Sequence, residues 1–286
     1  MSSTKQLIVY QHDLDGFKVQ LIEEEKSQAT IDKYVLDVRR FLEYIELRGE
    51  DLSKENCIAY KEQLMERYKS TSVNTMIAGI NHFLKYKGEF GLCLKPLRVQ
   101  HRIFAEEGSL LSKQEYGRLV QTAFQKGYEK IALIMETICS TGIRVSELKD
   151  ITAEAVRDGQ TEVYNKGKIR TVFLPDKLRK ALKTYMGKKQ ITEGPVFVTR
   201  NNKPVARGNI WTMMKRMARL SGISMKKVFP HNLRHLFART FYETEKDIIK
   251  LADLLGHSNI ETTRIYTKTT GWECKKILNN LDLLFL

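Results

Sequence analysis

The sequence predicts a mainly α-helical protein that carries one small antiparallel β-sheet. Apolar residues recur at spacings of three and four along most of the chain, as expected of helices that bury one face. Residues 161–175 instead contain two β-favouring runs around the hairpin-like tip Asn165, Lys166, Gly167 and Lys168. A chain of 286 residues with 42% hydrophobic residues can bury two cores, so we expect two domains.

The first hundred residues predict a bundle of four or so helices. The clearest pattern runs from Ile31 to Ile45, where apolar residues follow helical spacing and Gly49 provides a stop. Similar patterns predict three more helices, at about residues 17–26, 53–68 and 72–87. We therefore expect a helical domain over residues 1–100.

A linker is predicted at roughly residues 92–110. Helical periodicity fails after Gly88, and Pro96 interrupts the segment that follows. Ser112 then opens a capping box with Glu115, a pattern in which each side chain bonds the other residue's backbone N–H. This pattern marks the first helix of a second domain, which we place at residues 111–286.

The second domain is predicted to combine helices with the single sheet. Apolar spacing favours helices at about residues 113–124, 129–140, 207–221, 231–243 and 247–255. A turn at Thr141 and Gly142 leads into a short helix that carries Arg144 and Glu147. Residues 195–198 are a candidate further strand of the sheet, and the last ten residues, 277–286, are strongly apolar.

The excess of positive charge lies beyond the first domain. The formal net charge is +14, yet residues 1–100 hold 15 basic and 15 acidic residues. Between residues 161 and 230, 17 basic residues face only three acidic ones, a surplus of 14. Such a concentration of charge, mixed with apolar residues, favours a nucleic-acid partner over a basic surface kept for solubility.

The sequence offers no membrane span, secretory signal or zinc motif. No stretch approaches the roughly 18 uninterrupted apolar residues of a span. The four cysteines are widely spaced and form no CxxC pair, so neither a metal site nor a disulfide framework is expected. We expect a cytoplasmic protein.

Several polar residues could serve phosphate chemistry, although each alone has an ordinary structural interpretation. Arg144 taken alone is an arginine paired with Glu147, three residues further on. His231 and Arg234 would leave one face of a helix and could meet a single anion. His235 could suggest a metal ligand, but no acidic or sulfur ligand completes a set, so packing inside the domain is preferred.

The combination and order of these segments closely resemble the tyrosine recombinase or phage integrase family. The family pattern is an arginine in TGLRxSEL, a hairpin lysine, HxLRH, LGH, and a tyrosine nine residues beyond that last histidine. The corresponding segments here are TGIRVSEL at 141–148, NKGKIR at 165–170, HNLRHLFA at 231–238 and LGHSNIETTRIY at 255–266. The resemblance extends from about residue 110 to the C-terminus. The first hundred residues resemble the family's core-type DNA-binding domain, in a two-domain, Xer-like arrangement.

The resemblance implies an active site of six residues. They are Arg144, Lys166, His231, Arg234, His257 and Tyr266. Glu147 would position Arg144, and His235 would support the site. The family's hairpin usually has one more residue between its lysines, GKGNK against NKGK here, so Lys168 is the alternative to Lys166.

This set of residues suits attack on a phosphodiester. The five-coordinate phosphorane gains negative charge, which two permanently protonated guanidinium groups can stabilise. Tyr266 has a reference pKa of about 10 and needs a base, for which either His231 or His257 is suited. The resemblance assigns protonation of the leaving 5′ oxygen to the hairpin lysine. A phosphotyrosine bond keeps the energy of the broken phosphodiester, so no metal, nucleotide or other cofactor is expected.

The resemblance also implies the partners. Two domains would hold double-stranded DNA in a C-shaped clamp, and four protomers on two sites would exchange strands through a Holliday junction, in integration, excision, inversion or resolution. Residues 277–286 would form a C-terminal helix that is exchanged between protomers or packs on its own domain. A cytoplasmic, nucleoid-associated protein is expected. Two alternatives stay open: a type IB topoisomerase, which needs no partner site, and a non-catalytic DNA-binding regulator on the same scaffold.

Overall fold

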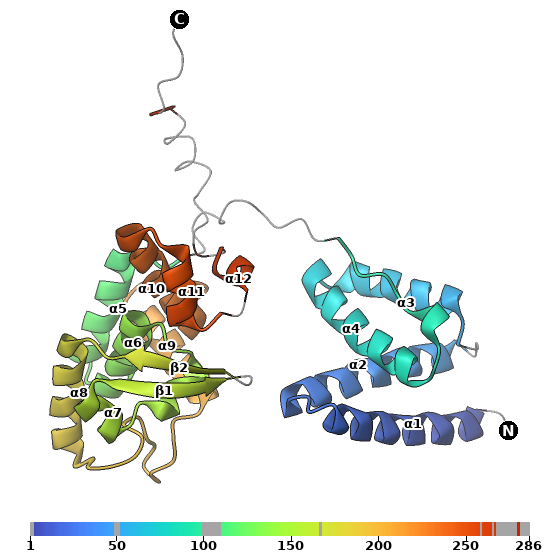
Figure 1. Cartoon of the computed structure of the whole chain (residues 1–286), viewed down its shortest axis with the longest axis horizontal. Helices are drawn as coiled ribbons and strands as arrows, with labels where there is room; N and C mark the ends of the chain where they lie inside the picture. The colour runs from blue at the N-terminus through green and yellow to red at the C-terminus, as the bar shows by residue number, and fades with distance from the viewer. Residues whose placement is uncertain are drawn as a thin grey trace, which may run out of the picture. The chain divides into compact units, whose positions relative to one another are not determined.

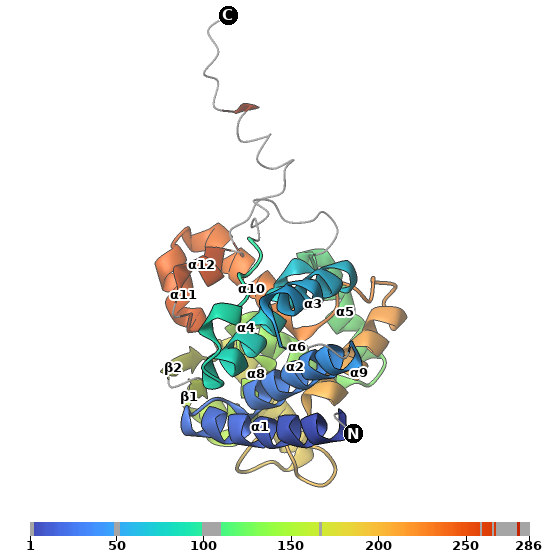
Figure 2. The same ribbon diagram turned by 90° about the vertical axis from the view of Figure 1, so that its right-hand side faces the viewer.

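The chain forms two compact units, which are described separately. The computed structural model describes residues 3–48, 52–98, 110–165, 168–257, 259–264, 266 and 279–280. The first unit is Met1–His101 and the second is Arg102–Leu286 (Figures 1 and 2). Their boundary falls inside the segment 92–110, of which residues 99–109 lie outside the described ranges.

The first unit is built from four helices. They are α1 (Ser3–Glu23), α2 (Gln28–Leu47), α3 (Lys54–Arg67) and α4 (Ser70–Tyr86), followed by the 3-10 turn η1 (Phe90–Leu92). Phe17, Phe41 and Phe83 are fully buried at the centre, and the rings of Phe17 and Phe83 meet edge to face at 5.4 Å. The predicted helical bundle is confirmed, but α1 begins at Ser3 instead of near Phe17. Residues 7–10 are a consecutive apolar run, which carries no helical spacing.

The second unit surrounds one helix that is apolar on nearly all sides. Its elements are α5 (Lys113–Gln125), α6 (Glu129–Thr141), η2 (Val145–Asp150), α7 (Ala153–Asp158), β1 (Gln160–Asn165), β2 (Lys168–Phe173), α8 (Asp176–Lys189), α9 (Arg207–Leu220), α10 (Pro230–Glu245), α11 (Ile248–Leu255) and α12 (Ile260–Arg264). Helix α6 packs against α5, α8, α9 and α10 (Figure 1). Its buried residues run from Ile131 to Thr141 around most of the helix, as expected of a central core helix.

The predicted hairpin is confirmed, whereas the further strand is not. Strands β1 and β2 pair antiparallel, with Asn165 opposite Lys168. Residues 195–198 do not join them in the described structure, where the sheet has two strands. Pro195 instead forms an isolated bridge with Thr152, and Val198 forms one with Pro204. The Val196 N–H donates to Ile151 O, so this segment is paired with the η2–α7 connection and not with the hairpin edge.

Three described helices were not predicted, namely α7, α8 and α12. Helix α8 buries Leu178, Leu182, Tyr185 and Met186 on one face, but its five lysines dilute the apolar pattern. The predicted short helix after Thr141 is a 3-10 helix that begins at Val145, one residue after Arg144. A 3-10 helix repeats every three residues, so the α-helical pattern does not identify it.

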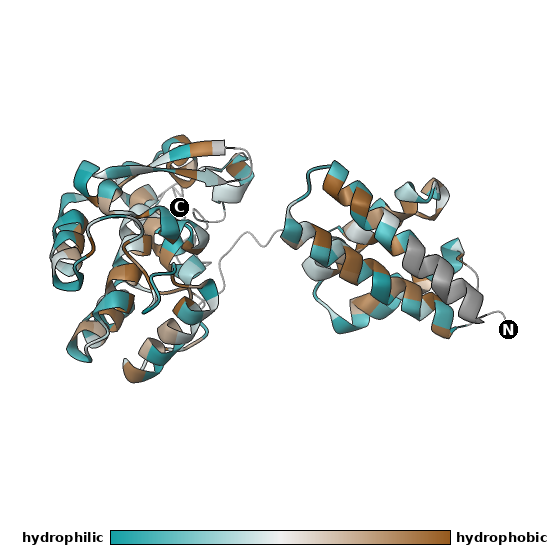
Figure 3. Ribbon diagram, turned by 90° about the horizontal axis from the view of Figure 1, so that it is seen from below, coloured by the Kyte–Doolittle hydropathy of each residue, from teal (hydrophilic) through white to brown (hydrophobic). Residues whose placement is uncertain are grey.

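Hydrophilic and hydrophobic residues alternate along the helices of both units (Figure 3). Their apolar faces form separate buried cores in the two units. Within the described ranges, no helix combines the length and the apolar character that a membrane span needs. The apolar segment 277–286 lies almost entirely outside the described residues.

Candidate active site

The turn after α6 carries Arg144, and Glu147 holds that arginine through hydrogen bonds. Gly142 ends α6 with a φ of +66°, and a Cβ there would lie 2.5 Å from the Phe237 ring, so the turn requires glycine on both grounds. Arg144 is the N-cap residue of η2. Its backbone N–H and its Nη1 each donate to the Glu147 carboxylate at 2.9 Å. The carboxylate therefore fixes both ends of the arginine.

Glu147 also binds a second arginine, Arg170 of β2. The Arg170 Nη2 donates to Glu147 Oε2 at 2.5 Å, and its Nη1 donates to Leu254 O at 3.4 Å. Burial alone would raise the pKa of Glu147, but hydrogen bonds from Arg144 and the charge of Arg170 lower it below its ordinary value. Arg170 was not among the predicted site residues, although it lies in the segment NKGKIR.

Helix α10 supplies His231 and Arg234 from one face. Arg234 is buried, and its guanidinium donates to Gly142 O and, at 2.7 Å, to Leu255 O. Burial and the nearby charge of Arg144 lower the pKa of Arg234 to about 10, so it stays protonated at neutral pH. His231 lies at the surface with part of its ring exposed, and the partial burial of the ring, together with the charges of Arg234 and Arg144, lowers its pKa.

The turn after α11 fixes the tautomer of His257. Arg234 Nη2 lies 3.1 Å from His257 Nε2, and Thr263 Oγ1 lies 2.8 Å from His257 Nδ1. Burial and the arginines lower the pKa of His257 to about 4, so the ring is neutral. A guanidinium can only donate, so Nε2 accepts and the ring proton is on Nδ1, which donates to Thr263. Thr263 is fully buried and was missed, because a threonine three residues before a tyrosine has no distinctive pattern.

Tyr266 lies among the three histidines. Its ring is 4.5 Å from the ring of His235, edge to face, 5.8 Å from His257, nearly parallel, and 6.4 Å from His231. It is 3% exposed, and its hydroxyl interacts with the guanidinium of Arg234. His235 packs against it, and burial lowers the pKa of His235 to about 4. In the part of the chain that is described, no group of three histidine, cysteine or acidic side chains is arranged to hold a metal.

A cavity of about 330 Å³ opens beside these residues. We call it the arginine cavity, and its basic and aromatic lining comprises Arg144, Arg207, Trp211, Lys215, Phe229, His231 and Arg234. Lys215 lies over the Trp211 ring at 5.0 Å and the Phe229 ring at 5.5 Å, a cation–π arrangement. A second hollow along α9 shares Trp211 and Lys215 and adds three basic side chains, Arg216, Arg219 and Lys226. The α9 residues were not singled out in the sequence.

The hairpin lysine is not located by the structure. Lys166 lies outside the described residues. The backbone of Lys168 begins β2 opposite Asn165. Five of the six predicted site residues therefore lie within the described structure, in three separated stretches of the chain. They are Arg144, His231, Arg234, His257 and Tyr266.

Two family models match the chain. The phage integrase family model matches residues 109–271, which is more than half of the sequence. The chain belongs to the phage integrase family. The phage integrase N-terminal SAM-like domain matches residues 14–89 of this integrase. The resemblance that the sequence motifs carried is thereby confirmed.

Individual relatives agree with this family. The "Tyrosine recombinase XerA" of Thermococcus kodakarensis is 28% identical over 281 residues, 95% of each chain. The solved structure of XerH recombinase bound to palindromic difH substrate has a TM-score of 0.72 at 17% identity, covering 91% of this chain and 83% of that one. A lambda integrase tetramer bound to a Holliday junction has a TM-score of 0.71 at 17% identity, covering 90% and 76%.

The predicted fold class is confirmed, and this integrase is a tyrosine-type site-specific recombinase. The comparisons give no support to a type IB topoisomerase or a non-catalytic regulator. Its structural neighbours include recombinases in complex with DNA, one of them as a tetramer.

Proposed function

We propose that Tyr266 is the nucleophile of a recombinase that cleaves and rejoins DNA through a 3′-phosphotyrosyl intermediate. The observation that supports this most strongly is the position of Arg234. Its buried guanidinium lines the arginine cavity beside Arg144 and His231, and it also contacts His257 and Tyr266. A phosphate in that cavity would meet two arginine forks and lie next to the tyrosine.

The proposed step balances without an external cofactor. The Tyr266 oxygen forms a bond to phosphorus, the bond from phosphorus to the 5′ oxygen breaks, and the 5′ hydroxyl leaves with one proton. The reverse reaction by the 5′ hydroxyl of a second strand restores the phosphodiester and frees the tyrosine. Exchange of both pairs of strands through a Holliday junction then gives recombined duplexes.

We assign the proton acceptor to His231. His257 Nε2 already accepts from Arg234, and its Nδ1 is bonded to Thr263. The His231 ring makes no hydrogen bond to any described residue, and its lowered pKa keeps it neutral with a lone pair available. His257 would then help to hold the phosphate. The general acid would be Lys166, with Lys168 as the alternative.

We propose double-stranded DNA as the partner of both units. The basic hollow along α9 shares Trp211 and Lys215 with the arginine cavity, and its positive charge suits the phosphate backbone next to the cleaved bond. The SAM-like first unit would bind the same duplex and complete a clamp, and this DNA-bound protein would be cytoplasmic and associated with the nucleoid. Affinity for DNA should fall steeply with salt.

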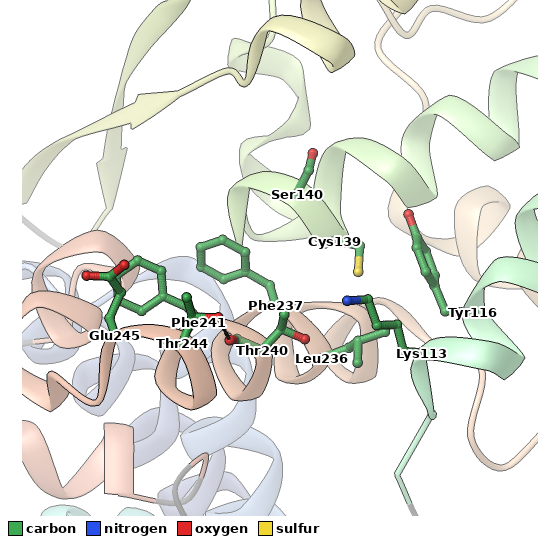
Figure 4. A pocket seen from close by; sticks show the side chains of 10 residues that line it. All are labelled: Lys113, Tyr116, Cys139, Ser140, Leu236, Phe237, Thr240, Phe241, Thr244 and Glu245. Atoms are coloured by element: carbon green, nitrogen blue, oxygen red, sulfur yellow. Dashed lines mark hydrogen bonds between the residues drawn. The ribbon is translucent and has the colours of Figure 1, made fainter.

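We further propose a homotetramer in which the tail of one protomer docks on the next. An apolar groove of about 390 Å³ lies between α10 and the pair α5 and α6 (Figure 4). Phe237 and Phe241 of α10 lie on one side, with Cys139 of α6 and Tyr116 of α5 on the other. The apolar segment 277–286 is a suitable occupant. Deleting that segment should leave cleavage of a single site measurable and reduce recombination between two sites.

Covalent trapping tests the central proposal. Nicked duplexes drawn from DNA that flanks the gene should give a protein–DNA adduct that the Tyr266→Phe variant does not form. Peptide mass mapping should locate the attached 3′ phosphate on Tyr266. DNA binding with no adduct, equal in the two proteins, would refute the proposed chemistry.

A further inference from the structure

We infer that Arg170 is a positioning residue for the proposed cleavage site, where it shares the charge of Glu147 with Arg144 and braces the turn that carries His257. The inference rests on the proposed function. Arg170 would touch neither DNA nor the tyrosine. It would act through Glu147 and through the backbone of the turn after α11.

The first observation is the pairing of two arginines with one buried carboxylate. The side chains of Arg170 and Glu147 are 10% and 4% exposed. Glu147 Oε2 accepts from both the Arg144 N–H and Arg170 Nη2, while Oε1 accepts from Arg144 Nη1. Among the described residues, Arg170 reaches this carboxylate from a strand 23 positions away along the chain.

This arrangement determines how much positive charge Arg144 offers to a phosphate. If Glu147 were paired with Arg144 alone, its carboxylate would largely neutralise the guanidinium that the substrate needs. With Arg170 as a second partner, two positive charges face one negative charge within the described part of this cluster, which keeps a net charge of about +1 in a site of low dielectric. Arg170 therefore allows Glu147 to orient Arg144 without cancelling its charge.

The second observation is the close approach of Arg170 to the turn at Gly256. A Cβ at Gly256 would lie 2.4 Å from Arg170 Cδ and 2.8 Å from its Nε, so the arginine stem runs against the backbone just before His257. Arg170 Nη1 also donates to Leu254 O. One side chain thus joins the hairpin, the η2 turn and the histidine turn.

The third observation is a cost that stability alone does not explain. Arg170 Nε is buried and has no hydrogen-bond partner among the residues that the structure describes. A buried unpaired donor is unfavourable, and such exceptions are concentrated at functional sites. An apolar residue at this position would avoid that cost but could not share the charge of Glu147.

The test compares five variants of the full chain, of which Glu147→Gln and its combination with Arg170→Gln serve the melting measurement alone. Arg170→Gln removes the charge, and Arg170→Lys keeps it but cannot reach both Glu147 and Leu254 O. Arg179→Gln is the matched control, because Arg179 is also a partly buried arginine that bonds a carboxylate and backbone carbonyls, with partners from α7 and α8. The measurements are the single-turnover rate of adduct formation at saturating DNA, the dissociation constant for DNA, and thermal melting without DNA.

We expect Arg170→Gln to lower the adduct rate at saturating DNA by about a hundredfold, the loss typical of a misplaced reacting group. DNA affinity should change far less, Arg170→Lys should recover part of the rate, and Arg179→Gln should match the natural protein. In melting, the combined loss from Glu147→Gln and Arg170→Gln should be smaller than the sum of the single losses, because the two residues interact.

Two results would overturn the inference. One is a folded Arg170→Gln protein with an adduct rate within about twofold of natural, which is the scatter of independent sites. The other is melting losses that add, which would show that Arg170 and Glu147 do not act together. If the natural protein itself forms no adduct, the proposed function fails, and the melting cycle alone still decides whether the brace exists.

Discussion

Replacing Thr263 by valine should uncouple His257 from the proposed phosphate site. The two side chains have nearly the same shape, so the fully buried position stays filled and only the hydroxyl is lost. His257 Nδ1–H would then have no partner at 2.8 Å, which costs about 1–3 kcal/mol for a buried donor. If the proton moved to Nε2 instead, it would point at the N–H of Arg234, whose Nη2 lies 3.1 Å from Nε2, so the other tautomer is also unfavourable.

The rate of adduct formation on nicked duplex should therefore fall by about 10- to 100-fold, as when an outer partner of an oriented histidine is removed. Thr263→Ser is the matched control, because it restores the hydroxyl, and it should recover most of the rate. The backbone bond from Tyr266 N–H to Thr263 O is unchanged in both variants, so tyrosine placement is not at issue. Nitrogen NMR should find the natural His257 protonated on Nδ1. A proton on Nε2, or a valine variant with the natural rate, would refute this reasoning.

Other variants and conditions test different parts of the site. Glu147→Gln should lower the free energy of unfolding by about 3 kcal/mol, measured by urea denaturation, because it takes the carboxylate away from the largely buried charge of Arg170 and the half-buried charge of Arg144. The pKa values of His235 and His257 are depressed to about 4 in the folded protein. Their contribution to the free energy of unfolding should therefore be fully present above about pH 6.5 and be lost as the pH drops towards 4, by at most about 3 kcal/mol for each. Between pH 6.5 and 5 the natural protein should lose more stability than His235→Asn does. A urea midpoint of the natural protein that does not change over this pH range would contradict the prediction. Trp211→Ala should weaken DNA binding about tenfold, since it removes an exposed aromatic face beside basic side chains; a fluorescence anisotropy titration with unchanged affinity would remove α9 from the proposed interface.

Local sequence patterns predicted many of the helices and the hairpin, because the spacing of neighbouring residues determines such elements. The hairpin strands flank a tip of turn-forming residues, and the capping box at Ser112 and Glu115 forms both of its hydrogen bonds. His231 and Arg234 share a helix face because they are three residues apart. Helix α8 was missed because lysines interrupt its apolar stripe, and segment 195–198 was misassigned because β-favouring composition does not specify a partner strand.

Two supporting residues of the site, Arg170 and Thr263, could not be predicted by spacing. Arg170 reaches Glu147 from 23 residues away, and Thr263 meets His257 across a turn. Both contacts depend on how separate elements pack, which one sequence does not encode as a periodic pattern. Resemblance to the family supplied the residues proposed to face the phosphate, together with the supporting residues Glu147 and His235, but it supplied neither Arg170 nor Thr263. The choice between Lys166 and Lys168 stays a prediction.

The charges of the described site explain why it should bind an anion. Arg144, Arg170 and Arg234 bring three guanidinium groups close together, and Glu147 is the carboxylate that two of them share. Burial lowers the pKa values of the neighbouring histidines, so they add no positive charge at neutral pH. Arg234 donates to two backbone carbonyls, which carry no net charge and therefore do not neutralise the guanidinium. A phosphate would supply that missing negative charge, and the phosphorane would supply more of it. The site should therefore favour the transition state over the ground state through charge already in place before DNA arrives.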